Sequence, residues 1–238
     1  MSPSVLVFAV WPYVALTVFV VGHVWRWRRD QAGWTSRTSQ MLAPRGLRLA
    51  SPLFHLGALA VIGGHALGLL VPPAVTSAFV SEHTYHLTAL IGGLTTGAVM
   101  VTGLVLLVIR RVRYRERLRV VTTPLDWVVY GLLVVIAAIG LWATFGQNVV
   151  GSGYDYRETI SVWFRSLFVL NPDVDLMADV PFVFQLHIAV AFVFVAIWPF
   201  TRLVHVWSVP LGYLVRPYIV YRKAGTGTRP AVTRTPWA

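Results

Sequence analysis

The stretch LFHLGALAVIGGHALGLL, residues 53–70, is apolar throughout and contains no Asp, Glu, Lys or Arg. A helix of about 20 such residues crosses the hydrocarbon core of a bilayer. Two histidines, His55 and His65, interrupt the stretch at a spacing of ten residues. An ionisable ring inside a membrane helix is unfavourable unless it has a partner. The stretch therefore predicts a membrane span and raises the question of what its two imidazoles bind.

The composition of the whole chain is that of an integral membrane protein. Of the 238 residues, 56% are hydrophobic and 12% are charged, whereas soluble domains contain about 25% charged residues. The predicted fold class is an all-α integral membrane protein with five transmembrane helices in one domain over residues 1–212, followed by a basic tail over 213–238. The five apolar runs long enough to span a bilayer lie near residues 4–25, 50–71, 86–109, 125–146 and 180–204.

The distribution of charge predicts how these helices are oriented. Eighteen of the twenty Lys and Arg residues lie in three segments, 26–48, 110–119 and 202 onward, and six of the nine acidic residues lie in the connections between them. Because positive charge stays on the cytoplasmic side, we expect an external N-terminus and a cytoplasmic C-terminus. The net charge of +11 is then a topology signal, a lipid contact or a docking face, and no nucleic-acid partner is expected.

Shorter segments lead to further predictions. The first apolar run precedes its basic cluster, so it is interpreted as a retained helix and not as a cleavable signal. Thr123, Pro124 and Asp126 open the fourth run in the pattern of a helix cap, which would account for Asp126 without a function. The polar connection 30–52 is expected to dock on another surface, and FRSLFVL at 164–170 to lie along the membrane surface.

The predicted topology sorts four of the seven histidines by depth. The second span runs outward, so His55 lies near the inner side and His65 further out. The fifth span runs inward, which places His187 near the outer side and His205 near the inner side. We therefore expect His65 to face His187 and His55 to face His205. The eighteen residues between His187 and His205 make five full turns, so both rings should lie on one side of a continuous helix.

Haem is the cofactor that fits these pairs best. The chain has no cysteine, which excludes thiolate-ligated haem, iron–sulfur clusters and c-type attachment. Two imidazoles on facing helices can supply both axial ligands of a haem iron, whereas zinc and copper require more ligands. His23 is interpreted instead as a hydrogen-bonded structural residue. Small residues are expected to make room for the flat rings or for a neighbouring helix: Gly57, Gly63, Gly64, Gly68, Gly93 and Gly97.

The motifs that contain these histidines resemble a known family. LFHLGALAVIGGHALGLL, with HVWRWRRDQAGWTSRTSQML before it and RLVHVWSVP after it, is similar to the gamma subunit of respiratory nitrate reductase, a di-haem membrane cytochrome b. The resemblance implies that His65 and His187 bind the distal haem b near the outer face. It implies that His55 and His205 bind the proximal haem b near the cytoplasm. The protein would then lie in a bacterial or archaeal plasma membrane, in contact with membrane lipid.

The resemblance also implies a reaction. Menaquinol or ubiquinol would be oxidised near the distal haem, and the electrons would pass to cytoplasmic iron–sulfur (beta) and molybdenum-cofactor (alpha) subunits that reduce nitrate to nitrite. The chain itself would have no nitrate site. Family members often carry a lysine in the quinol pocket, where this chain reads SEHTYHLTAL. His83, Tyr85 and His86 are the candidates for that role, and outer-surface polar residues without a role are nearly as good an interpretation.

Two other functions remain open from the sequence. The chain could be the cytochrome b subunit of another quinone-linked complex, such as a heterodisulfide-reductase-like enzyme, and its co-purified soluble subunits would distinguish the two. It could also be a five-helix transporter or structural anchor with a histidine proton relay. The absence of carboxylates from the second and fifth spans argues against such a relay.

Overall fold

The computed structural model of the chain describes residues 2–43, 45–151 and 153–208. The predicted basic tail over 213–238 and the domain boundary at residue 212 lie outside these described residues, and both stay predictions. Residues 2–208 belong to one compact unit of the chain, and all of the structure that follows is within it.

Five helical segments are long and apolar enough to cross a membrane, and the described residues contain no strand. This confirms the predicted all-α, five-span fold. The five segments are Pro3–Arg29, Leu47–Leu70, Glu82–Arg113, Pro124–Val150 and Phe182–Phe200. Their elements are α1 (Pro3–Val5), η1 (Leu6–Val10), α2 (Trp11–Arg29), α3 (Leu47–Leu70), α5 (Glu82–Arg113), α7 (Pro124–Phe145), η3 (Gly146–Val150), α9 (Phe182–Ile197) and η5 (Trp198–Phe200).

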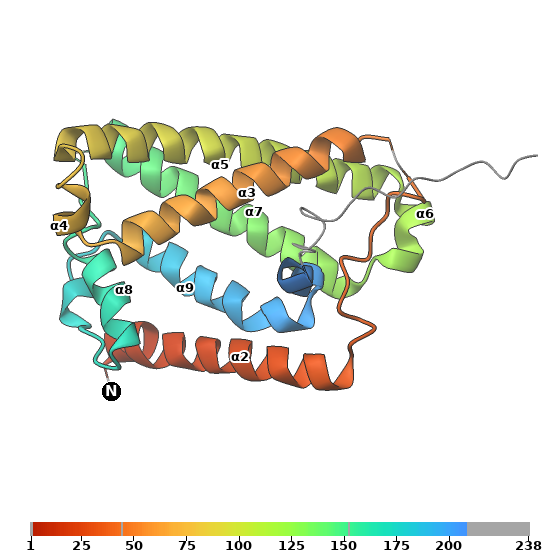
Figure 1. Cartoon of the computed structure of the whole chain (residues 1–238), viewed down its shortest axis with the longest axis horizontal. Coiled ribbons are helices and arrows are strands. Elements are labelled where there is room, and N and C mark those ends of the chain that lie inside the picture. The colour runs from red at the N-terminus through yellow and green to blue at the C-terminus, as the bar shows by residue number, and fades with distance from the viewer. Residues whose placement is uncertain (1, 44, 152, 209–238) are drawn as a thin grey trace, which may run out of the picture. The chain divides into compact units, whose positions relative to one another are not determined.

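Short helices complete the connections at the two ends of the bundle (Figure 1). We call the end that contains α6 and η6 the basic end, and the opposite end, which contains α4 and α8, the α8 end. Which end faces the cytoplasm stays a prediction. The short elements are α4 (Pro73–Thr76), α6 (Arg115–Leu118), η2 (Arg119–Val121), α8 (Ile160–Phe168), η4 (Asp175–Met177) and η6 (Arg202–Ser208).

The spanning helices pack in the order α3, α5, α7, α9 and α2. Two glycines allow the closest approach, between α3 and α5. A Cβ added to Gly103 would lie 2.2 Å from the backbone nitrogen of Phe54, and one added to Gly57 would lie 2.5 Å from that of Met100. Gly57 therefore allows a helix crossing, and the prediction that it makes room for a haem ring is wrong.

The largest apolar core lies at the α8 end and not between the helices at mid-depth. It includes Phe8, Ile160, Trp163, Leu167 and Phe192. Helix α8 packs into this core with one face, on which Trp163 and Leu167 are buried. In the segment 164–170, Leu167 is buried in this core and only the last residues, 168–170, are strongly exposed. That this segment lies along the membrane surface stays a prediction.

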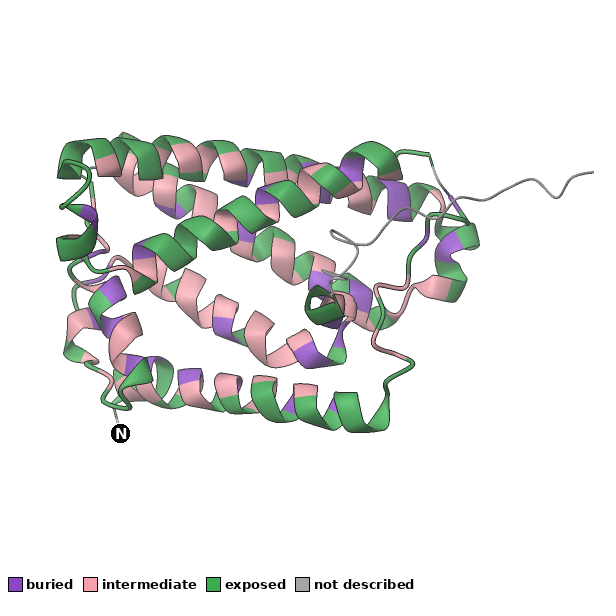
Figure 2. Ribbon diagram, in the orientation of Figure 1, coloured by how far each residue is buried: buried purple, intermediate pink, exposed green. Residues whose placement is uncertain are grey.

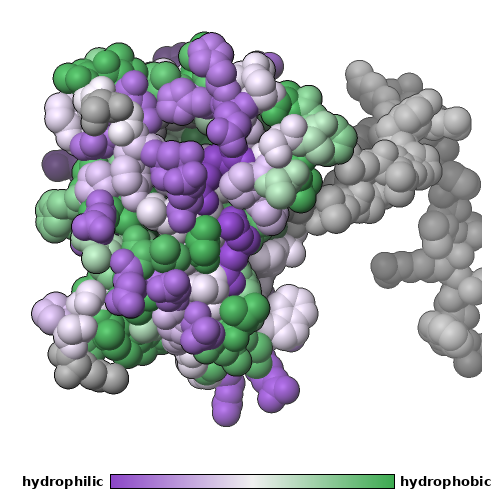
Figure 3. Space-filling model, turned by 90° about the vertical axis from the view of Figure 1, so that its left-hand side faces the viewer, coloured by the Kyte–Doolittle hydropathy of each residue, from purple (hydrophilic) through white to green (hydrophobic). Residues whose placement is uncertain are grey.

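Away from this core, the middle of the bundle is thinly packed. Figure 2 shows that most residues of α3 and α9 are exposed or only partly buried. Within the described chain, α3 and α9 do not form a packed helix pair, although each packs well on its other neighbours. The α8 end itself is rich in hydrophilic residues with hydrophobic ones among them (Figure 3), as expected for a face that leaves the membrane.

The connection between α2 and α3 docks on the chain's own helices at the basic end. Arg26 of α2 donates to the carbonyl of Gly33 at 2.7 Å. Arg110 of α5 donates to the carbonyl and hydroxyl of Ser39 and to the carbonyl of Ala43. The prediction that this connection docks on a surface is confirmed, and buried arginines of the same chain provide that surface.

The fifth span is not continuous, which corrects the prediction of a helix over 180–204. Helix α9 ends at Ile197, a single 3₁₀ turn follows, and Thr201 has extended backbone with φ −104° and ψ 178°. Pro199 accounts for the break because it has no N–H and its ring clashes with the preceding turn. The argument from five full turns between His187 and His205 is therefore wrong, and η6 carries His205 as a separate segment.

Candidate functional site

Four histidines from α3, α9 and η6 form two facing pairs. The ring centres of His65 and His187 lie 6.1 Å apart, and their planes are inclined by 24°. The ring centres of His55 and His205 also lie 6.1 Å apart, with planes inclined by 69°. These are the pairs that the topology predicted from depth. Their role as haem ligands is not tested by these distances and stays a prediction.

Three of the rings have the same hydrogen bond. The Nδ1 of His55 lies 2.8 Å from the carbonyl of Ser51, that of His65 lies 2.8 Å from the carbonyl of Val61, and that of His205 lies 2.6 Å from the carbonyl of Arg202. Because a carbonyl can only accept, Nδ1 carries the proton in each ring. The Nε2 lone pair is then free to bind a metal, and such a backbone bond is the usual support of a metal-binding imidazole.

His187 is held differently. Its ring packs against Gly140 of α7, where an added Cβ would lie 2.9 Å from the ring carbon Cε1. Its Nδ1 is buried without a hydrogen-bond partner among the described residues. The backbone of Ile136 lies near this ring, but the geometry is not that of a hydrogen bond. A buried nitrogen without a partner is uncommon, and packing against Gly140 sets the orientation of this ring.

The spacing within each pair fits one metal between two imidazoles. With metal–nitrogen bonds of about 2 Å to each ring, the two ring centres lie about 6 Å apart. No group of three or more His, Asp or Glu side chains that could hold a metal occurs in the described part of the chain. Each donor set is thus two imidazoles, which suits the axial positions of haem iron and not tetrahedral zinc.

Open space surrounds the glycines near the His65 pair. A Cβ added at any of four glycines of α3 and α5 would meet no atom within 4 Å, and the four are Gly63, Gly64, Gly92 and Gly93. Gly63 and Gly64 were expected to leave room for a flat ring, Gly93 for a flat ring or a neighbouring helix, and Gly92 was missed. The donor set and this open space both fit haem.

Two other glycines have a different role from the one predicted. An added Cβ at Gly68 would lie 2.6 Å from the hydroxyl of Tyr156, so Gly68 makes room for that tyrosine and not for a ring. At Gly97 an added Cβ would lie 2.8 Å from the side chain of Leu141. Gly97 therefore lets α7 approach α5, which is one of the two alternatives predicted for it.

His23 uses both of its ring nitrogens within the protein. Its Nδ1 donates to the carbonyl of Phe19 at 2.7 Å, and its Nε2 accepts from the indole N–H of Trp207 at 3.0 Å. The interpretation of His23 as a structural residue is thus supported. Its partner on η6 was not foreseen from the sequence.

The structure separates the three quinol-pocket candidates at the start of α5. His83 and His86 are exposed, whereas Tyr85 is half-buried. The guanidinium of Arg157 lies 3.9 Å from the centre of the Tyr85 ring. Burial, together with the neighbouring phenol of Tyr85, raises the pKa of Tyr156 above its usual value.

Arg157 and Tyr156 were missed by sequence reasoning. Arg157 is 7% exposed, donates to the hydroxyl of Thr76, and has a buried Nε without a partner in the described residues. The sequence did contain a signal, because Arg157 is one of only two basic residues outside the three positive segments. Arg157 is thus buried at a position that the positive-inside distribution of charge does not explain, and its contacts with Thr76 and Tyr85 account for it.

The fold and the site define a five-span membrane protein with two facing histidine pairs at different depths. The chain belongs to the nitrate reductase gamma subunit family, whose model matches residues 4–224. This confirms the resemblance seen in the sequence, and with the five spans it makes the chain a multi-pass protein of the bacterial plasma membrane.

Individual relatives agree with this assignment. The chain is 44% identical to the nitrate reductase gamma chain of Bacillus subtilis over 224 residues, which are 94% of this chain and 99% of that protein. It is 33% identical to the respiratory nitrate reductase 1 gamma chain of Escherichia coli over 216 residues, 90% and 95% of the two chains. It is 49% identical over 219 residues, 91% of its length, to the nitrate reductase-like protein NarX of Mycobacterium tuberculosis, and it spans about a third of that relative.

Proposed function

We propose that this chain is the quinol-oxidising and electron-transfer subunit of a membrane-bound quinol:nitrate oxidoreductase. The observation that carries the proposal is the pair of equal ring distances, 6.1 Å in each histidine pair, in a member of the nitrate reductase gamma subunit family. The chain also anchors the complex in the membrane. Nitrate is reduced elsewhere, on a partner subunit.

In this proposal each histidine pair holds one haem b through its two Nε2 atoms, His65 with His187 and His55 with His205. Haem b, when bound, accepts and donates single electrons. The chain's own contribution is to orient the rings. Carbonyl bonds to Nδ1 fix the tautomer of His55, His65 and His205 and increase the basicity of Nε2, and packing against Gly140 orients His187. The apolar helices around the two histidine pairs exclude water from the path that the electrons would take between them.

The quinol is oxidised at the α8 end, near His65. Oxidation of one quinol to quinone yields two electrons and two protons; the haems held by the histidine pairs would accept the electrons, and the protons leave to the solvent outside. Tyr85 is the favoured hydrogen-bond partner of the quinol, because it lies half-buried between the Arg157 guanidinium and the Tyr156 phenol. His83 and His86, which are exposed, are the alternative hydrogen-bond partners. Menaquinol and ubiquinol both suit this chemistry.

The electrons leave at the basic end, which faces the cytoplasm in this proposal. The partners there are an iron–sulfur (beta) subunit and a molybdenum-cofactor (alpha) subunit that reduces nitrate to nitrite. Exposed arginines around α6, such as Arg115 and Arg117, suit contact with acidic protein surfaces and with anionic lipid.

The test is to purify the protein with its partners and to measure its haem b by pyridine haemochrome spectra. We expect two haems b for each chain, reduced by added quinol and reoxidised by nitrate. A colourless protein would contradict the proposal and favour a transporter or a structural anchor. Soluble partners that contain no molybdenum cofactor would assign the chain to another quinone-linked complex.

A further inference from the structure

His205 requires support that α9 does not provide. The helix ends at Ile197, and Thr201 is extended, so the orientation of α9 is not transmitted to the seven-residue 3₁₀ segment η6. Segments of this type have poor hydrogen-bond geometry and are seldom stable alone. Nevertheless the ring of His205 faces His55 at 6.1 Å, the same distance as in the other pair. Something outside α9 must therefore hold η6 in place.

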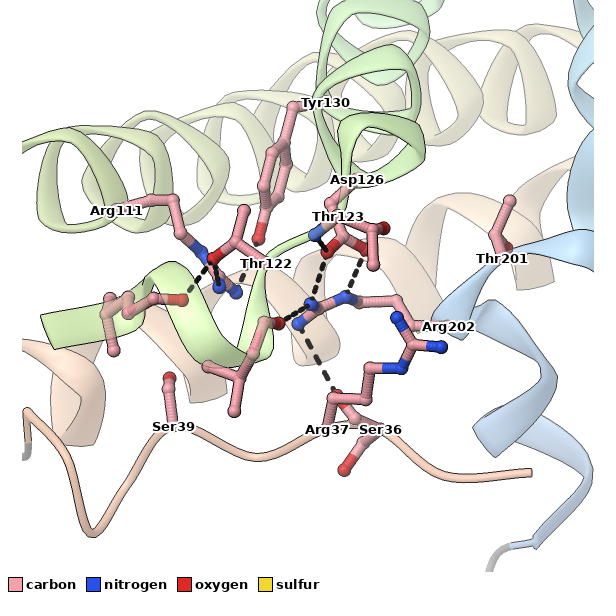
Figure 4. A network of polar contacts seen from close by, with 12 residues as sticks. Ser36, Arg37, Ser39, Arg111, Thr122, Thr123, Asp126, Tyr130, Thr201 and Arg202 are labelled. Carbon is pink, nitrogen blue, oxygen red and sulfur yellow. Dashed lines mark hydrogen bonds and ion pairs between the residues drawn. The ribbon is translucent and has the colours of Figure 1, made fainter. Parts of the chain in front are cut away.

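The first support comes from α7 through an ion pair. Arg202, the first residue of η6, donates from Nε to Oδ1 and from Nη2 to Oδ2 of Asp126, both at 2.7 Å (Figure 4). It also donates to the carbonyls of Val121 at 2.9 Å and Ser36 at 3.4 Å. Asp126 is 3% exposed and Arg202 14% exposed in their side chains. Two parallel bonds of this kind fix the orientation of the Arg202 guanidinium as well as its distance from the Asp126 carboxylate.

Asp126 is itself anchored. Its Oδ2 accepts the backbone N–H of Thr123 at 2.8 Å, as expected of the predicted helix cap. The cap interpretation is confirmed but does not account for the Arg202 contact. The carbonyl of Arg202 in turn accepts the Nδ1–H of His205 at 2.6 Å. The start of α7 is thus connected to the ring of His205 through a single residue.

The second support comes from α2. Trp207, two residues after His205, donates its indole N–H to His23 at 3.0 Å, and His23 donates to the carbonyl of Phe19 in its own helix. The ring of Phe19 also lies 6.3 Å from that of Trp207. The two supports therefore lie on either side of His205 along η6 and come from different helices.

We propose that Asp126, acting through Arg202, and His23, acting through Trp207, are positioning residues that fix the ring of His205 opposite His55. The proposal rests on the proposed function in that it takes His205 as a haem ligand. The His65–His187 pair has no such supports, because both of its rings lie within α-helices. Loss of either support should thus change the haem site of the His55–His205 pair and leave that of the His65–His187 pair unchanged.

The experiment uses the purified complex with Asp126→Asn and Trp207→Phe, singly and together. Asn keeps an oxygen for the Thr123 N–H and removes the charge, and Phe keeps an aromatic ring without the donor. The low-spin EPR signal of a haem depends on the angle between its two axial imidazole planes, and the two pairs differ in that angle. We expect each single variant to shift one EPR signal and its midpoint potential. We expect the double variant to lose that haem, as we also expect of His205→Ala.

Arg111→Gln is the matched control. Arg111 is a buried arginine of the basic end that donates to Thr122 and Tyr130 and, among the described residues, makes no hydrogen bond to η6. We expect it to leave both EPR signals unchanged. If Asp126→Asn does not assemble, Asp126→Asn with Arg202→Gln removes both charges of the pair and serves instead. If Asp126→Asn and Trp207→Phe both gave the EPR signals of the wild type, this inference would be overturned and the proposed function would stand. A wild-type complex without haem b would overturn both.

Discussion

A histidine inside an α-helix can reach the carbonyl four residues earlier with its Nδ1, and His55 and His65 both do so. The bond directs Nε2 away from the helix axis toward the neighbouring segment. The pairing of these residues with His205 and His187 could be predicted from the sequence, because the charge distribution orients the spans and helix geometry sets the depth of each residue along α3. The contact of His187 with Gly140 could not be predicted, since it joins two helices whose relative rotation depends on packing.

At this scale the first prediction concerns His65. We expect His65→Ala to remove one of the two haems b and to stop reduction by quinol, because a single imidazole is left in that pair. Pyridine haemochrome spectra and EPR of the purified complex would measure the loss. His83→Ala, at an exposed position, is the control and should retain both haems. Two haems in the His65→Ala protein would contradict the assigned pair.

The second prediction concerns Tyr156, whose pKa is raised by burial and by the neighbouring phenol of Tyr85. The unfolded chain loses the phenolic proton near its usual pKa of about 10, before the folded protein does. The stabilising effect of the neutral phenol is therefore complete below that pH and is lost as the pH rises above it. Thermal unfolding midpoints from pH 8 to pH 11 should fall more steeply for the wild type than for Tyr156→Phe. Parallel curves would contradict the burial of this phenol.

Among the elements, α3 and α5 show that glycines of one pair of helices have opposite roles. At the crossing, Gly57 and Gly103 bring the two backbones together, whereas Gly92 and Gly93 face open space. Both kinds appear in the sequence as small residues in apolar runs. Only the crossing point of the helices distinguishes them, and one sequence does not contain that information.

The third prediction tests this distinction. Gly103→Ala should lower the thermal unfolding midpoint of the detergent-solubilised protein, because its Cβ would lie 2.2 Å from the Phe54 nitrogen and overpacking costs about 1–3 kcal/mol. Gly131→Ala, in α7, should leave the midpoint unchanged, since its Cβ meets no atom within 4 Å. Equal effects of the two substitutions would contradict the crossing.

The fifth span marks the limit of prediction for elements. Five spans could be predicted because the length of an apolar run decides whether it crosses a bilayer. The break after Ile197 was overlooked although Pro199 is in the sequence, because proline either kinks a helix or ends it. The pairing of Asp126 with Arg202 joins positions 76 residues apart. Such a contact follows from the assembled bundle and has no local signature.

For the molecule as a whole, the open question is which end faces the cytoplasm, and the fourth prediction addresses it. The chain has no cysteine, so single cysteines can be labelled without background. We expect Asp173→Cys, exposed at the α8 end, to react with an impermeant maleimide in intact cells. Arg117→Cys, exposed at the basic end, should react only after the membrane is opened. The reverse pattern would invert the predicted topology.

The fifth prediction concerns the stability of the assembled bundle. Arg26 is 4% exposed and donates to the carbonyls of Pro199, Thr201 and Gly33. Arg26→Gln should lower the thermal unfolding midpoint strongly, because each buried group left without a partner costs about 1–3 kcal/mol. The exposed neighbour Arg28 provides the control, and Arg28→Gln should have little effect. Similar midpoints for the two variants would contradict the role of Arg26 in joining α2 to the fifth span.

The buried arginines of the basic end also constrain how the chain is made. Arg26, Arg110 and Arg111 belong to the positive segments that direct insertion, yet each is at most 5% exposed in the folded protein. During synthesis these charges must be accessible, since orientation is decided as each span enters the membrane. The acceptors of Arg26 and Arg111 come from segments translated later, such as Thr201 for Arg26 and Tyr130 for Arg111. Biogenesis is therefore ordered in time, with insertion directed by free charges and assembly completed when the same charges are enclosed.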